Sequence, residues 1–168
     1  MRKKLLSLGI LVTTVGILVS CGGVKKYHAT LYDTALKWMT DEYITANMTK
    51  NSMIPESRES PGSIINTIRT ESEFEDAFTT FPKELDFEKE MLILYFFTGD
   101  IIIHKITGER AFSYRIKKIS FVDEVLNLTF EKKALVKGPT GSPPTQECLV
   151  VAMDKVDYSA INVSLIYD

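Results

Sequence analysis

The chain has 168 residues, of which 20 are basic and 22 acidic, and its formal net charge at pH 7 is −2. A chain of this length can form a single domain whose hydrophobic core needs no disulfides. The basic residues are scattered, whereas nucleic-acid binding requires a concentrated positive face. The composition therefore argues against a nucleic-acid-binding protein.

The first 20 residues have the layout of a secretory signal peptide. Basic residues at positions 2–4 precede an uncharged stretch over 5–19. This stretch is shorter than the about 20 apolar residues that a membrane-spanning helix needs. A positive start, a short apolar middle and a small residue at the end are typical of a signal peptide. We expect cleavage between Ser20 and Cys21, with an uncleaved signal anchor as the alternative.

The motif Leu18-Val19-Ser20-Cys21 resembles the lipobox of bacterial lipoproteins. The resemblance implies that the Cys21 thiol receives a diacylglycerol and that Cys21 becomes the first residue of the mature chain. A further acyl chain such as palmitate would make anchoring stable, because each buried methylene contributes about 0.8 kcal/mol. A coincidental cysteine is the alternative. The motif predicts a protein that is lipid-anchored at the extracytoplasmic face of the cell membrane.

After the signal peptide over 1–20, we predict a lipidated tether over 21–29, an N-terminal helix and loop over 30–61, and a β-rich domain over 62–168. Apolar residues recur at three- and four-residue steps from Thr30 to Ala46, a spacing that predicts an amphipathic helix. Its aromatic residues could face the domain, the membrane or a protein. We therefore regard Trp38 and Tyr43 as candidate partner-surface residues.

The pattern after residue 62 predicts one helix and several strands. A strand over 64–68 is followed by Thr70 and Glu73, which match the capping box of a helix start. Apolar residues at helical spacing continue to Pro82. Further apolar and β-branched runs predict strands over 91–97, 101–106, 114–121, 125–130, 148–153 and 161–167. We expect an α+β fold, with a mostly antiparallel β-sheet or small barrel or sandwich and one or two helices.

A turn-rich segment separates the middle strands from the last two. It begins at Gly138 and ends at Pro144, and its glycines and prolines are typical of turns. Such a segment is a natural contact surface. Gly138, Pro139 and Gly141 are therefore candidate partner-surface residues.

Few residues carry the chemistry of a catalytic or metal site. Cys148 lies in an apolar run, where a thiol behaves as a small hydrophobe, so we expect it to be buried. Neither His28 nor His104 has the spacing of a metal ligand set. The acidic residues over 71–76 suit the first turn of a helix, and those over 154–157 suit a polar turn. We expect no catalytic residue, no metal and no cofactor.

Three segments follow one another within 64–168: DFEKEMLILY at 86–95, Tyr114-Arg115-Ile116 and the segment over 144–157. Their order resembles small lipoproteins of Gram-positive bacteria. More distantly, it is similar to the C-terminal domain of protease-complex-subunit (PrcB-type) lipoproteins. The chain has Phe112-Ser113-Tyr114 where PrcB-type domains usually carry Gly-Gly-Tyr. The resemblance implies a domain that assists or binds a protease.

Together these features predict a non-catalytic binding or accessory module, held at the membrane by its lipid, with an extracytoplasmic protein such as a protease as its partner. One alternative is a hydrolase that uses carboxylates near Tyr95 or Asp100, which would require a pocket with convergent titratable groups. Another is a small ligand-binding lipoprotein. Solute-binding proteins normally close two lobes on their ligand, and this chain has about half the length that two lobes need.

Overall fold

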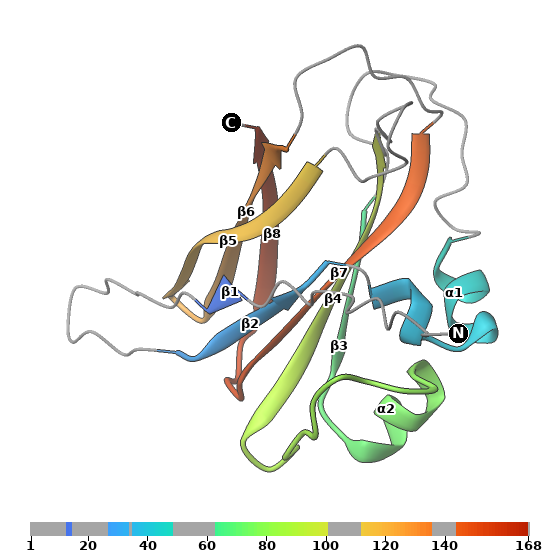
Figure 1. Cartoon of the computed structure of the whole chain (residues 1–168). Coiled ribbons are helices and arrows are strands. Elements are labelled where there is room, and N and C mark those ends of the chain that lie inside the picture. The colour runs from blue at the N-terminus through green and yellow to red at the C-terminus, as the bar shows by residue number, and fades with distance from the viewer. Residues whose placement is uncertain are drawn as a thin grey trace, which may run out of the picture.

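The computed structural model describes residues 27–33, 35–48, 63–100, 112–135 and 144–167, and also the backbone of 13–14. These residues form two β-sheets and a layer of helices (Figure 1). No helix within these ranges combines the length and apolar character that crossing a bilayer requires.

The larger sheet has five strands in the order β1-β2-β7-β4-β3, and all its neighbours are antiparallel. The strands are β1 (Thr13–Thr14), β2 (Ala29–Tyr32), β7 (Pro144–Asp154), β4 (Glu90–Asp100) and β3 (Ile64–Ile68). β4 and β7 are the two long central strands, and they pair along their whole length from Glu90 opposite Asp154 to Asp100 opposite Pro144.

The smaller sheet has three strands in the order β5-β6-β8. They are β5 (Phe112–Val122), β6 (Val125–Ala134) and β8 (Ala160–Tyr167). β5 and β6 form an antiparallel hairpin, whereas β8 lies parallel to β6. The hairpin turns at Asp123 and Glu124, whose φ angles are 50° and 61°, as a turn of type I′ requires.

The helical layer consists of the 3₁₀-helix η1 (Ala35–Trp38) and the α-helices α1 (Asp41–Met48) and α2 (Glu71–Ala77). The predicted capping box of α2 is confirmed. The Thr70 hydroxyl accepts a hydrogen bond from the Glu73 amide at 3.3 Å, and the Glu73 carboxylate accepts one from the Thr70 amide at 3.1 Å. The helix ends at Ala77, before the predicted end at Pro82, because Phe78 has extended backbone angles.

The larger sheet is buried on both faces, which gives the molecule three layers. One face packs against the smaller sheet and the other against the helices. Alternate residues of β4 enter the two cores: Met91, Ile93, Tyr95 and Phe97 enter the core between the sheets, and Leu92, Leu94 and Phe96 enter the core under the helices. Strands buried on both faces have nearly continuous apolar runs. The α+β fold with mostly antiparallel strands that the sequence predicts is thus confirmed, and of the arrangements left open it is the sandwich.

The structure differs from the predicted helix over 30–46. Residues 29–32 form β2, which pairs with Met153 to Val150 of β7, and only 35–38 and 41–48 are helical. Because β2 pairs with β7 in the larger sheet and is buried there, pairing and burial override the helical spacing of its apolar residues. Tyr27 is also buried, with 5% of its surface exposed. The predicted tether over 21–29 is therefore too long at its C-terminal end, because the folded domain already includes Tyr27 and Ala29.

Several predicted features lie outside the described residues. They are the lipidation and cleavage residues Cys21 and Ser20, the strand over 101–106, His104, and the partner-surface candidates Gly138, Pro139 and Gly141.

Candidate functional site

The sandwich has two ends, which are defined by the two ends of the ladder between β4 and β7. At one end, which we call the tether end, the chain enters the domain at Tyr27, and Ala29 pairs with Met153. At the other, the far end, Asp100 pairs with Pro144. The ladder of β4 and β7 is 11 residues long, so the two ends are about 30 Å apart. β4 ends and β7 begins at the far end (Figure 1).

A group of buried polar side chains lies between the sheets toward the far end. The Tyr114 hydroxyl of β5 donates a hydrogen bond to Glu147 Oε1 of β7 at 3.1 Å. Lys132 is opposite Tyr114 in the ladder of β5 and β6, and its ammonium lies 4.1 Å from the centroid of the Phe112 ring. Glu147 and Lys132 are each only 4% exposed. We call Tyr114, Lys132 and Glu147 the far-end cluster.

Strand alternation explains why these charged groups lie inside. Glu147 precedes Leu149 and Val151 on the face of β7 that packs against the smaller sheet, and Lys132 follows Phe130 on the inner face of β6. Buried charges are costly unless they are paired or hydrogen-bonded. The far-end cluster therefore places a carboxylate, an ammonium and a phenol inside the sandwich, where the Tyr114 hydrogen bond to Glu147 joins the two sheets.

Sequence reasoning missed the far-end cluster. Glu147 and Lys132 belong to no motif, and Tyr114 was noted only as part of the PrcB-type resemblance. The signal that could have found them is a charged residue in the inward register of an apolar strand, as in Glu147-x-Leu149-x-Val151.

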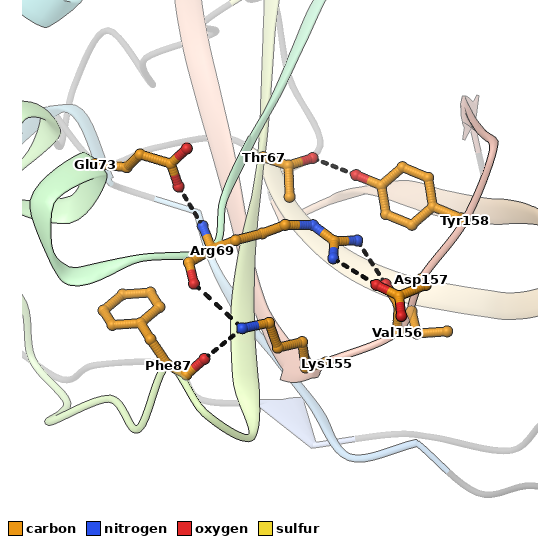
Figure 2. Close-up of polar contacts among 8 residues, drawn as sticks. All are labelled: Thr67, Arg69, Glu73, Phe87, Lys155, Val156, Asp157 and Tyr158. Carbon is orange, nitrogen blue, oxygen red and sulfur yellow. Dashed lines mark hydrogen bonds and ion pairs between the residues drawn. The ribbon is translucent and has the colours of Figure 1, made fainter.

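A second polar network ties elements together near the tether end (Figure 2). Arg69, which follows β3, donates to the Val156 carbonyl at 2.6 Å and to Asp157 Oδ1 at 2.9 Å. Its guanidinium carbon also lies 5.1 Å from the centroid of the Tyr158 ring, and the Tyr158 hydroxyl is hydrogen-bonded to Thr67. Arg69 thus holds the connection between β7 and β8 against the end of β3.

Lys155 completes this network. Its ammonium donates to the Phe87 carbonyl at 2.7 Å and to the Arg69 carbonyl at 3.4 Å. The neighbouring Asp154 accepts a hydrogen bond from the His28 amide at 2.8 Å. The predicted polar connection over 154–157 therefore joins β7 to β8. We call the hydrogen-bond network of Arg69 and Lys155 the clamp, because it holds this connection against β3 and Phe87.

The aromatic candidates Trp38 and Tyr43 are half-buried and pack on the domain. The Trp38 ring centroid lies 5.9 Å from that of Tyr32 and 5.8 Å from that of Phe81. The Tyr43 hydroxyl accepts a hydrogen bond from Asn66 at 3.2 Å, and burial raises its pKa above the usual value. Of the three orientations left open by the sequence, both side chains take the one toward the domain.

A surface depression of about 450 Å³ lies beside α1. Asp41, Glu42, Thr45 and Ala46 line it. All four residues belong to one helix, and both acidic residues are exposed. Among the residues that the structure describes, the titratable groups of this depression thus come from α1 alone, whereas an active site gathers such groups from several elements.

Two of the residues considered for catalysis, Cys148 and Tyr95, lie in the cores. Cys148 is buried as predicted, and burial raises the pKa of its thiol well above the usual value, which keeps it protonated and poorly nucleophilic. Tyr95 stacks between Phe97 and Phe130, with ring centroids 5.0 and 5.9 Å away. Within the described ranges, no group of three or more His, Cys, Asp or Glu side chains could hold a metal ion.

No family model, curated protein sequence or solved structure matches this chain.

Proposed function

We propose that this protein is an extracytoplasmic lipoprotein, anchored in the cell membrane through Cys21, that acts as a non-catalytic binding or accessory module. The lipobox Leu18-Val19-Ser20-Cys21 and the signal-peptide layout before it support the anchor. Cleavage before Cys21 would remove β1, which lies at 13–14. β2 would then be the first strand of the mature protein.

The burial of Tyr27 is the structural observation that supports the proposal, because it shows how close to Cys21 the folded domain begins. Five residues separate Cys21 from Tyr27, and Tyr27 is packed in the core between the sheets. A chain of this length spans at most about 20 Å when fully extended. A lipid on Cys21 would therefore hold the tether end close to the bilayer and direct the far end away from it.

This orientation assigns different roles to the two ends. The clamp of Arg69 and Lys155 would lie near the membrane, where it stabilises the fold. The strand ends at Asp100 and Pro144 would point toward the extracytoplasmic space, and the buried far-end cluster would lie on that side of the core. Loops at one end of a rigid scaffold are common binding surfaces. We therefore place the partner-binding surface at the far end.

The proposed partner is an extracytoplasmic protein. The resemblance of residues 64–168 to PrcB-type domains supports a protease as that partner, because such domains are thought to assist or bind one. The buried, protonated thiol of Cys148 and the packing of Tyr95 in the core support a role in binding rather than in hydrolysis.

Photo-crosslinking in intact cells would test the proposal. A photoreactive amino acid is placed at Leu135, which is 57% exposed and follows β6 at the far end, or at the exposed Glu88, which precedes β4 at the tether end. We expect a discrete protein adduct from Leu135 and lipid adducts from Glu88. A Cys21→Ala background is the control, and it should abolish the lipid adducts.

Two results would contradict the proposal. Lipid adducts from Leu135 with protein adducts from Glu88 would reverse the orientation. If both positions gave only background labelling in a properly lipidated protein, the binding role would be wrong although the anchor was right.

A further inference from the structure

The two edges of the smaller sheet have opposite chemistry. One edge strand is β5, which carries Arg115, Lys117 and Lys118. Its pairing with β6 shifts register between Ile116 and Lys118. At the other side, β8 has the sequence AINVSLIY and contains no charged residue. Charges and bulges protect edge strands from pairing with other chains. β5 is therefore a protected edge, and β8 lacks both devices.

β8 is also long enough to support a stable pairing. It has eight residues, whereas β1 and β3, the edge strands of the larger sheet, have two and five. Very short edge strands are another common protection against unwanted pairing. In the described part of the chain, the sheet order ends at β8, so no strand lies beyond it.

The side chains of β8 form an apolar row that the protein covers only in part. Ile161, Val163 and Leu165 are half-buried against the core between the sheets, and Ile166 on the opposite face is 39% exposed. Ser164 donates to Thr129 of β6 at 3.2 Å. β8 is thus hydrogen-bonded to β6 on one side, and on its other side its apolar side chains remain partly exposed.

We propose that a second copy of this chain pairs with β8, antiparallel to it, around a two-fold axis at Val163. Residues opposite each other in an antiparallel pair point to the same face. Pairing about Val163 places Ile161 opposite Leu165 on the inner face. It places Asn162 opposite Ser164 and Ala160 opposite Ile166 on the outer face. The strand is complementary to itself, since no two like charges meet.

The protected edge explains why the assembly would stop at two copies. Joining two β8 strands gives a continuous sheet in the order β5-β6-β8-β8-β6-β5, and both of its outer edges are β5. Those edges carry the basic residues and the pairing irregularity. A head-to-tail pairing of β8 with β5 would instead generate an open filament, and the chemistry of β5 opposes it. The dimer inference concerns the fold and holds whether or not the chain is lipidated.

Cysteine crosslinking of the full chain in native membranes tests the register. Asn162→Cys and Ser164→Cys are introduced together, because each is predicted to lie opposite the other in the partner. We expect a disulfide-linked dimer under mild oxidation. Lys118→Cys on β5 and the unmodified chain are the controls, and both should remain monomeric on non-reducing gels. Overturning results would be no dimer from the double variant, or a disulfide only to a different protein.

A charge on the open edge tests the interface without a crosslink. In the protein isolated from membranes in detergent, light scattering should give a dimer, and Ser164→Lys should raise its dissociation constant by at least about tenfold because it adds charge to the pairing strand. Ser113→Lys adds the same charge to β5 and should leave the dimer intact. Thermal unfolding checks that both variants fold. A monomeric unmodified protein, or a folded Ser164→Lys variant that dimerises normally, would overturn the proposal. Should Ser164→Lys fail to fold, the cysteine pair decides.

Discussion

The Tyr114 hydroxyl reaches across from the smaller sheet to the Glu147 carboxylate of the larger sheet, at 3.1 Å. Tyr114 and Glu147 are 3% and 4% exposed, so this hydrogen bond lies within the sandwich. The Tyr114 ring also meets the Phe97 ring edge to face, with centroids 5.7 Å apart. The contact therefore fixes how the two sheets are placed relative to each other at the far end.

Tyr114→Phe should lower the free energy of unfolding by about 1–3 kcal/mol, because a buried carboxylate loses a donor. Glu147→Gln keeps an oxygen that can accept the hydrogen bond and should cost less than Tyr114→Phe. Urea denaturation followed by tryptophan fluorescence measures both. Equal stability of Tyr114→Phe and the unmodified protein would show that the hydrogen bond contributes nothing.

The two partners of the ion pair between Arg69 and Asp157 should contribute differently to stability. Arg69→Ala should destabilise the protein by about 1–2 kcal/mol, since it removes the hydrogen bond to the Val156 carbonyl and the packing on Tyr158. Asp157→Asn should have no measurable effect, because the Asp157 side chain is 100% exposed and exposed ion pairs are weak. A larger loss from Asp157→Asn than from Arg69→Ala would contradict this assignment.

We expect Glu131 to account for part of the loss of folding stability at acidic pH. Lys117, which donates to its carboxylate at 2.7 Å, and the neighbouring Arg115 hold the pKa of Glu131 below its usual value. The unfolded chain therefore takes up a proton at higher pH than the folded chain does. The stability that Glu131 contributes is present above its unfolded pKa and is lost as the pH falls through its folded pKa.

Glu131→Gln should consequently reduce the stability difference between neutral and acidic pH. Urea denaturation at pH 7 and at pH 3 measures that difference, and Glu88→Gln is a matched exposed control that should leave it unchanged. An unchanged or larger difference in Glu131→Gln would refute the assignment.

The hairpin between β5 and β6 contains backbone strain that glycine would relieve. Glu124 has a φ of 61°, a conformation that costs about 1 kcal/mol for a residue with a side chain. Its carbonyl accepts a hydrogen bond from the Ser159 amide at 2.8 Å, which a glycine can also accept. Glu124→Gly should therefore raise the unfolding temperature. Glu124→Val, which is β-branched, should lower it, and the reverse order would count against the turn geometry.

Much of the fold could be predicted because local patterns and tertiary packing agree. The apolar run over 91–97 is continuous because β4 is buried on both faces, and Thr70 and Glu73 form the capping box that their spacing predicts. Both features depend on nearby residues. The α+β class follows from them.

Other features depend on residues far apart in the chain, for which the local sequence is an insufficient guide. The segment over 29–32 has helical spacing, yet it forms a strand because β7, more than 100 residues later, offers an edge to pair with. The parallel placement of β8 beside β6 likewise follows from the path of the chain between the two sheets. The inward register of Glu147 can be read from the sequence, but its pairing with Tyr114 arises only when both sheets are assembled.

Mass spectrometry of the native protein extracted from membranes tests the central claim most directly. Our account predicts an N-terminal peptide that begins at Cys21 and carries diacylglycerol on its sulfur. A peptide that begins at Met1 and contains an unmodified thiol at position 21 would contradict both the anchor and the orientation of the domain.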